Sequence, residues 1–174
     1  LRGRCRHCRA PISPRYPAVE LLSALLAGVV VWRFGSDVAG LAALLLVWAM
    51  VALTFIDLDT QFLPDDLTLP LLWTGLLFNL TGTFVPLQDA VIGAVAGYLT
   101  LWLVYWAYRF ATGKEGMGYG DFKLFAALGA WFGWTALIPM ILMASVIGAV
   151  VGIAMKVFSQ LREGGYVPFG PFLA

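Results

Sequence analysis

Two short acidic segments carry the side chains best suited to chemistry. The first, residues 57–66, reads Asp-Leu-Asp-Thr-Gln-Phe-Leu-Pro-Asp-Asp and directly follows an apolar stretch. The second is a glycine-punctuated run that ends at Asp121. Two carboxyl groups that share one proton can position a water molecule and polarise an amide carbonyl, because two like charges a few ångströms apart cannot both ionise. One carboxyl group from each segment, Asp57 and Asp121, would therefore supply an acid and a base for hydrolysis.

The places of the two aspartates on their helices predict which one holds the proton. Asp57 follows the C-terminal end of an apolar helix, where the helix dipole disfavours a negative charge, whereas Asp121 opens a helix whose free N–H groups favour it. We therefore predict that Asp57 is the more often protonated partner. Asp59 is an alternative to Asp57, because the two lie on different faces of any continuing helix. Asp65 and Asp66 are better suited to cap the helix that follows them.

The residues next to Asp121 suit a site that receives a peptide. Gly118 and Gly120 flank Tyr119, and glycine permits positive φ and lets an extended substrate backbone approach without interference from a Cβ atom. Lys123 has two plausible roles: it lowers the pKa of the Asp121 carboxyl group, or its side chain extends to lipid phosphates.

The elements that must position these groups are apolar helices. Of the 174 residues, 61% are hydrophobic and 12% are charged, whereas an average soluble domain has about 25% charged residues. Apolar stretches of about 20 residues are long enough to cross a bilayer. We therefore predict an all-α, polytopic membrane helical bundle of about six hydrophobic helices, at 17–32, 38–56, 67–85, 90–110, 122–134 and 135–158.

The placement of charge predicts an orientation. The net charge of +1 is too small to favour a nucleic-acid partner, so the lipid bilayer is the expected surroundings. If the N-terminal segment is cytoplasmic and each helix crosses once, ten of the eleven Lys and Arg residues lie on the cytoplasmic side and only Arg33 lies outside. Both acidic segments then reach the cytoplasmic face of the membrane.

Residues 1–16 form a basic arm, which we separate from a membrane domain at residues 17–174. The arm contains Cys5 and Cys8, whose C-x-x-C spacing suits a metal or redox site better than a disulfide framework. Such a pair supplies half of a four-cysteine zinc site. His7 is better explained as a solvated residue than as a zinc ligand.

Three segments in order carry a family resemblance. They are Phe-Ile-Asp-Leu-Asp at 55–59 with Leu-Pro-Asp at 63–65, then Gly-Met-Gly-Tyr-Gly-Asp-Phe-Lys-Leu at 116–124, and Pro-Phe-Gly-Pro-Phe at 168–172. Together they resemble the type IV prepilin peptidases, which are GxGD-type intramembrane aspartyl proteases. The arm, with Tyr16, Pro17 and Glu20, also matches, so the resemblance covers essentially the whole chain.

The resemblance implies that Asp57 and Asp121 are the catalytic pair. It also implies that the family's substrates are prepilins and pseudopilins of type IV pili and type II secretion, whose basic leader is removed after a glycine at the cytoplasmic face of the bacterial inner membrane. Proteolysis needs no cofactor, whereas many members then methylate the new N-terminus with S-adenosylmethionine. The residues assigned to the active-site loops are Gly118, Tyr119, Gly120, Lys123, Pro168, Gly170 and Pro171.

Two departures and two alternatives accompany this interpretation. The family pattern has a further C-x-x-C pair and span before residue 1 and a final span after Ala174, so we expect a piece of a longer protein, with zinc binding and methyl transfer left open for this chain. A small proton or ion carrier could instead use intramembrane acids as relay groups, although it would place them near the bilayer midplane. A GxGD protease with another membrane substrate would share the chemistry.

Overall fold

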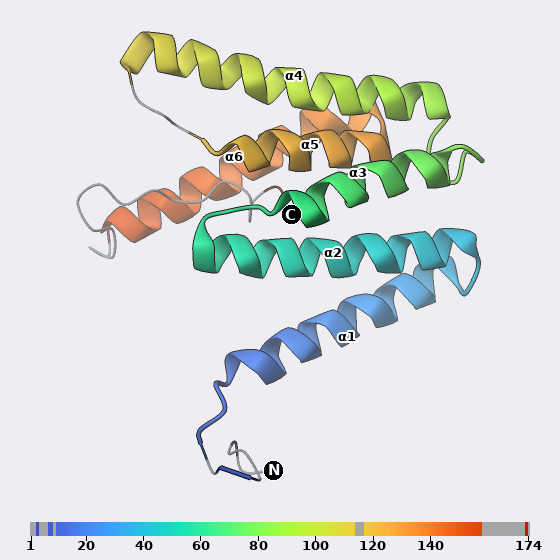
Figure 1. Cartoon of the computed structure of the whole chain (residues 1–174), viewed down its shortest axis with the longest axis vertical. Helices are drawn as coiled ribbons and strands as arrows, with labels where there is room; N and C mark the ends of the chain where they lie inside the picture. Colours follow the sequence, from blue (N-terminus) through green and yellow to red (C-terminus); the bar gives the residue numbers. More distant parts are fainter. Residues whose placement is uncertain (1–2, 4–6, 9, 114–116, 158–172, 174) are drawn as a thin grey trace. The chain divides into compact units, whose positions relative to one another are not determined.

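The computed structural model describes residues 3, 7–8, 10–113, 117–157 and 173. This part of the chain contains six helices (Figure 1), which confirms the predicted all-α architecture. The helices are α1 (Arg15–Phe34), α2 (Val38–Thr60), α3 (Asp65–Asn79), α4 (Leu87–Thr112), α5 (Tyr119–Phe132) and α6 (Trp134–Val157).

Four of the helices in the described residues are long and apolar enough to cross a membrane: α1, α2, α4 and the first 18 residues of α6. Helices α3 and α5 have 15 and 14 residues, which is short of the length of about 20 that a hydrocarbon core requires. The predicted number of helices is therefore confirmed for the described residues. Two of the six, α3 and α5, are too short to cross a bilayer unaided.

Helix α3 begins differently from the prediction. Pro64, with extended backbone, occupies the N-cap, and no side chain caps the helix. Asp65 and Asp66 lie in the first turn instead, where their charges still suit the positive end of the helix dipole. The prediction that they cap the helix is therefore wrong. The helix also ends earlier than expected, at Asn79 rather than near Val85.

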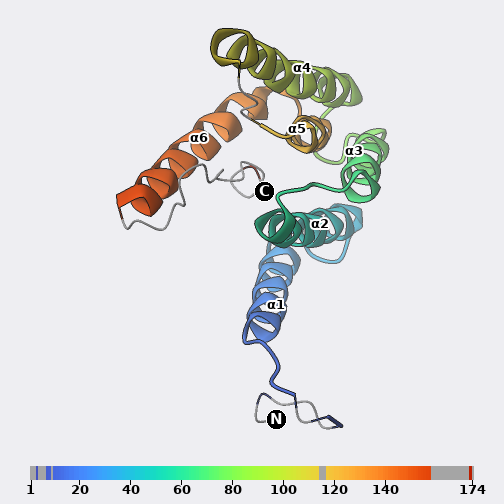
Figure 2. The ribbon, with the colours of Figure 1, turned by 60° about the vertical axis from the view of Figure 1, so that its left-hand side comes forward.

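The chain divides into two compact units, residues 1–51 and 52–174. In the second unit, α5 lies between α3 and α4 and contacts both, and it also contacts α6 (Figures 1 and 2). Ten of the 14 residues of α5 are buried. Both acidic segments belong to this unit, so Asp57 and Asp121 lie in the same compact part of the fold. The separate arm at residues 1–16 stays a prediction.

Glycines allow α4 and α5 to come into backbone contact. A Cβ atom on Gly93 would overlap the carbonyl oxygen of Gly129, and one on Gly97 would lie 2.6 Å from the carbonyl oxygen of Phe125. Small residues at a helix interface permit this close approach, which increases the van der Waals contact that holds helices together in lipid. The position of α5 is therefore tied to that of α4.

Asn79 joins the ends of α3 and α5. The side chain is fully buried, and its Nδ2 donates to the carbonyl oxygens of Ala130 (2.9 Å) and Trp131 (3.1 Å). Its Oδ1 accepts hydrogen bonds from the backbone N–H groups of Phe84 (3.0 Å) and Val85 (3.2 Å). Every polar atom of this side chain is thus paired, as buried polar groups require. Asn79 fixes the α3–α4 connection against the C-terminal end of α5.

Replacing Asn79 by alanine should destabilise the fold. The change leaves two buried carbonyl groups and two N–H groups without this partner, and we expect a loss of about 2–4 kcal/mol in the free energy of unfolding. Thermal unfolding of the purified protein in detergent measures it. Thr100→Ala is the control, because that exposed hydroxyl donates only within α4. Equal thermal unfolding midpoints for Asn79→Ala and Thr100→Ala would contradict the stabilising role of Asn79.

Candidate active site

Asp57 is buried near the end of α2. Its side chain is 4% exposed, and its Oδ2 atom is buried without a hydrogen-bond partner among the described residues. A buried carboxyl oxygen without a partner is uncommon in folded proteins and calls for a functional or structural reason. Asp59, the alternative candidate, is exposed. Burial therefore distinguishes Asp57 from Asp59, between which the sequence alone could not choose.

The turn that ends α2, four residues after Asp57, has an unusual backbone conformation at Gln61. Gln61 has φ +53°, and it is the one non-glycine residue with positive φ in the described part of the chain. Its N–H donates to the carbonyl oxygen of Asp57 (2.8 Å), which is the bond that a left-handed residue makes when it closes a helix. The hydroxyl group of Thr60 donates to the carbonyl oxygen of Ile56 (2.8 Å). Sequence reasoning missed this turn because no glycine marks it.

Asp121 lies in the first turn of α5, outside the four helices that could cross a membrane. It is 6% exposed, and its Oδ2 atom accepts a hydrogen bond from the N–H group of Gly118 (3.2 Å). Burial raises the pKa of the Asp121 carboxyl group to about 7, with a further contribution from the negative charge of Asp57, while the Gly118 hydrogen bond opposes the increase. The negative charge of Asp57 thus contributes to the ionisation behaviour of Asp121.

The helix N-terminus does not by itself decide the charge of Asp121. The Gly118 amide favours the ionised form, as expected, but burial outweighs it and raises the pKa of Asp121. Sequence reasoning could count the free N–H groups but not the burial. Which of the two carboxyl groups holds a shared proton stays a prediction.

The glycines beside Asp121 do not have the predicted conformation. Gly118 has φ −79°, and neither it nor Gly120 is among the residues with positive φ. A Cβ atom on Gly120 would lie 2.7 Å from the Cβ atom of Leu63, whereas one on Gly118 would lie 3.7 Å from the nearest oxygen of Asp121. Gly120 is therefore needed for the close approach of the first acidic segment, and not for a left-handed backbone.

Tyr119 packs among aromatic rings that α4 and α5 share. Its ring centroid lies 5.4 Å from that of Tyr105 and 5.5 Å from that of Phe122. Tyr105 is buried, and its hydroxyl group accepts a hydrogen bond from Nη1 of Arg109 (3.1 Å). Tyr119 itself is half exposed. The predicted loop residue thus joins the N-terminal end of α5 to the C-terminal end of α4.

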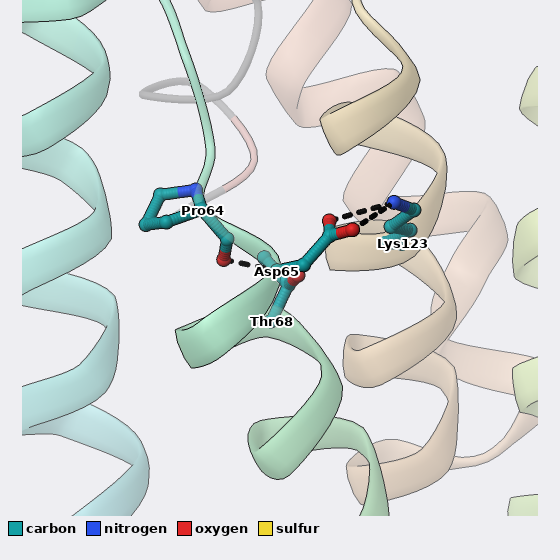
Figure 3. Close-up of polar contacts among 4 residues, drawn as sticks. All are labelled: Pro64, Asp65, Thr68 and Lys123. Carbon is teal, nitrogen blue, oxygen red and sulfur yellow. Dashed lines mark hydrogen bonds and ion pairs between the residues drawn. The ribbon is translucent and has the colours of Figure 1, made fainter.

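Lys123 forms an ion pair that the sequence did not indicate. Its Nζ atom lies 2.6 Å and 2.7 Å from the two carboxyl oxygens of Asp65 (Figure 3). The pKa of Asp121 is shifted by burial, by Asp57 and by the Gly118 hydrogen bond, and Lys123 is not among these causes. The ammonium group binds Asp65, and its extension to lipid phosphates stays a prediction. The residues are 58 positions apart, so no local pattern could have predicted the pair.

Several predicted residues lie outside the described part of the chain: Cys5, Pro168, Gly170 and Pro171. Cys8 is an exposed free thiol. Within the described ranges, no group of three or more His, Cys, Asp or Glu side chains could hold a metal ion. Zinc at the cysteine pair therefore stays a prediction.

Comparison with known proteins places these residues within a family. The model of the type IV leader peptidase family matches residues 44–153, and that of the bacterial peptidase A24 N-terminal domain matches residues 1–34. The prepilin leader peptidase/N-methyltransferases of Aeromonas hydrophila, Stutzerimonas stutzeri and Pseudomonas aeruginosa are 62%, 55% and 53% identical over all 174 residues. The chain spans 60% of the length of each of these relatives. No solved structure matches it.

The matched region includes both buried aspartates, all of α5 and the part of α2 from residue 44 onward. The apolar helices, together with the three bacterial relatives named above, identify a bacterial membrane protein. The family resemblance of the three ordered segments is confirmed. The chain belongs to the type IV leader peptidase family.

Proposed function

We propose that the protein containing this chain is a membrane aspartyl endopeptidase that removes the basic leader of type IV prepilins or pseudopilins. Relatives with 53–62% identity are named prepilin leader peptidase/N-methyltransferase. The observation that carries the proposal is the burial of two carboxyl groups from separate helices, Asp57 and Asp121, the first with an oxygen that has no hydrogen-bond partner among the described residues. The contribution of Asp57 to the raised pKa of Asp121 agrees with this arrangement. Two such groups, sharing one proton, supply the general acid and the general base for hydrolysis of an amide by water.

The proposed mechanism uses one shared proton. The protonated carboxyl group donates a hydrogen bond to the scissile carbonyl oxygen, while the ionised group accepts a proton from a water molecule that attacks the carbonyl carbon. A proton then passes to the leaving nitrogen, and the C–N bond breaks. The unpartnered Oδ2 atom of Asp57 has the hydrogen-bonding capacity that this step requires. Burial of both groups strengthens their interaction with the developing charge.

The position of the pair supports cleavage at the cytoplasmic face of the inner membrane. Asp57 lies near the end of α2 and Asp121 in the first turn of α5, so both carboxyl groups lie at helix ends. The distribution of Lys and Arg predicts that these ends are cytoplasmic, where a basic leader that has not crossed the membrane would meet them. A carrier with acids in mid-span is not favoured by this placement.

Methyl transfer with S-adenosylmethionine is a proposal for the full-length protein only. The names of the relatives include N-methyltransferase, but the described residues offer no cluster that fits a zinc ion. Cys8 is exposed, and Cys5 lies outside the described residues. We therefore assign no step of the reaction to a metal. The proposed hydrolysis needs the two carboxyl groups and water.

Removing either carboxyl group should abolish proteolysis. Asp57→Asn and Asp121→Asn each remove half of the shared-proton pair, and we expect cleavage to fall by at least about a thousandfold. The measurement is cleavage of a purified prepilin by the full-length protein in detergent micelles, followed on gels. Wild-type activity in either variant would refute the assignment.

Asp59→Asn and Asp66→Asn are matched controls for this experiment. Each makes the same change of charge and size, close to the first acidic segment, at an exposed position. Both should retain cleavage. If Asp59→Asn were inactive and Asp57→Asn active, the catalytic position on α2 would be Asp59 instead.

Cleavage should decline as the pH rises above about 7. The pKa of Asp121 is raised to about 7, so below this pH the pair retains a proton, and above it both groups ionise and the proton donor is lost. The pH dependence of kcat/KM between pH 5 and pH 9 measures this step. A rate that stays constant to pH 9 would contradict the proposed coupling.

Alanine at the two glycines should have different effects. Gly120→Ala brings a Cβ atom into Leu63, so we expect lower cleavage together with a loss of about 1–3 kcal/mol in stability from overpacking. Gly118→Ala fits the folded protein, so its thermal midpoint should be unchanged. A fall in cleavage by Gly118→Ala alone would locate the close approach of the substrate backbone at residue 118. Equal destabilisation by both changes would contradict the packing argument.

A further inference from the structure

The ion pair between Asp65 and Lys123 joins the two acidic segments. Asp65 lies eight residues after Asp57, and Lys123 lies two residues after Asp121. We propose that this ion pair is a positioning pair, which holds the first turn of α5 against the start of α3 and so places Asp121 relative to Asp57. The inference rests on the proposed peptidase function, and it assigns to Asp65 and Lys123 a role that does not involve contact with substrate.

The geometry of the pair is specific. The ammonium group of Lys123 contacts both oxygens of Asp65, at 2.6 Å and 2.7 Å, so the carboxyl group is held in one orientation (Figure 3). The backbone before Asp65 is also fixed: the carbonyl oxygen of Pro64 accepts hydrogen bonds from the N–H group of Leu67 and from the N–H and hydroxyl groups of buried Thr68. On the α3 side, the residue that forms the ion pair is therefore held in a hydrogen-bonded helical turn.

A second contact lies beside the ion pair. Leu63 is buried and packs against Gly120, which has no Cβ atom to keep it away. Gly120 and Lys123 are three residues apart, so they share one face of α5, whereas Asp121 projects about 100° away from Gly120. The contacts with residues 63–65 thus flank Asp121 along the chain, at Gly120 on one side and at Lys123 on the other. They fix the rotation of α5 about its axis, which decides where Asp121 points.

The effect on catalysis should exceed the effect on stability. The side chains are 28% and 51% exposed, and ion pairs at such positions contribute little to folding. Catalysis by two carboxyl groups depends on placement, and a displacement of about 1 Å can reduce a rate about a hundredfold. A positioning role therefore predicts that activity and stability separate when the pair is broken.

The first test compares single and exchanged variants of the full-length protein. Asp65→Asn and Lys123→Gln should each lower kcat for prepilin cleavage about tenfold, with KM and the thermal midpoint nearly unchanged. Lys123→Arg keeps the charge and should retain most of the activity. The double exchange Asp65→Lys with Lys123→Asp should recover more activity than either Asp65→Lys or Lys123→Asp alone, because it restores the attraction.

Asp66→Asn is the matched control. Asp66 is the next residue of the same helical turn, is exposed, and forms no ion pair with any residue that the structure describes. This variant should keep the wild-type kcat. If it falls as far as Asp65→Asn, the effect comes from the charge of the segment rather than from the pair, and the inference is wrong.

The second test does not depend on cleavage. In protein labelled with ¹³C at aspartate carboxyl groups, the Asp121 signal, assigned with Asp121→Asn, should titrate near pH 7. In Lys123→Gln its pKa should fall toward the usual aspartate value, because Asp121 moves away from its buried position beside Asp57, whereas loss of the ammonium charge alone would raise this pKa. An unchanged or higher pKa of Asp121 in Lys123→Gln would overturn the inference, as would a kcat that falls only in step with the thermal midpoint. Absence of cleavage by the wild-type protein would refute the proposed function, and this titration would still decide the inference.

Discussion

The mutual repulsion of two buried carboxyl groups is the constraint on which the site depends. A carboxylate that is removed from water is unstable, and a second one nearby makes it more so, so such a pair persists only if the surrounding structure holds it in place. Asp57 and Asp121 are both nearly inaccessible to solvent. The same instability retains a proton at neutral pH, which a carboxyl group in water would lose. Rigidity and acid–base chemistry are therefore consequences of one arrangement.

The rigidity comes from helix α5, which is held at both ends and along one side. Asn79 binds the backbone near its C-terminal end, and Gly93 and Gly97 allow α4 to lie against it. At the N-terminal end, Gly120 and Lys123 contact the start of α3. Asp121 projects from a helix that cannot easily rotate or slide.

The sequence predicted those features that depend on local pattern. The long apolar runs predicted the helices, and the two acidic segments between them predicted Asp57 and Asp121 as the groups of interest. Some predictions failed on local detail, such as the cap of α3 and the conformation of Gly118, whereas others failed because they depend on contacts between distant residues. Lys123 pairs with a residue of α3, and Gly120 is needed because Leu63 lies against it. The left-handed turn at Gln61 and the burial of Asp121 had no local signal.

The backbone contact between α4 and α5 also has a consequence for membrane insertion. At 1.5 Å per residue, the 14 residues of α5 extend about 21 Å, against a hydrocarbon thickness of about 30 Å. Its surface is largely covered by other helices, so lipid offers it little to bind. The glycine-lined surface of α4 is synthesised before α5, so this packing partner is already present when α5 is made. A helix too short to span the bilayer unaided therefore follows directly after the helix that buries it.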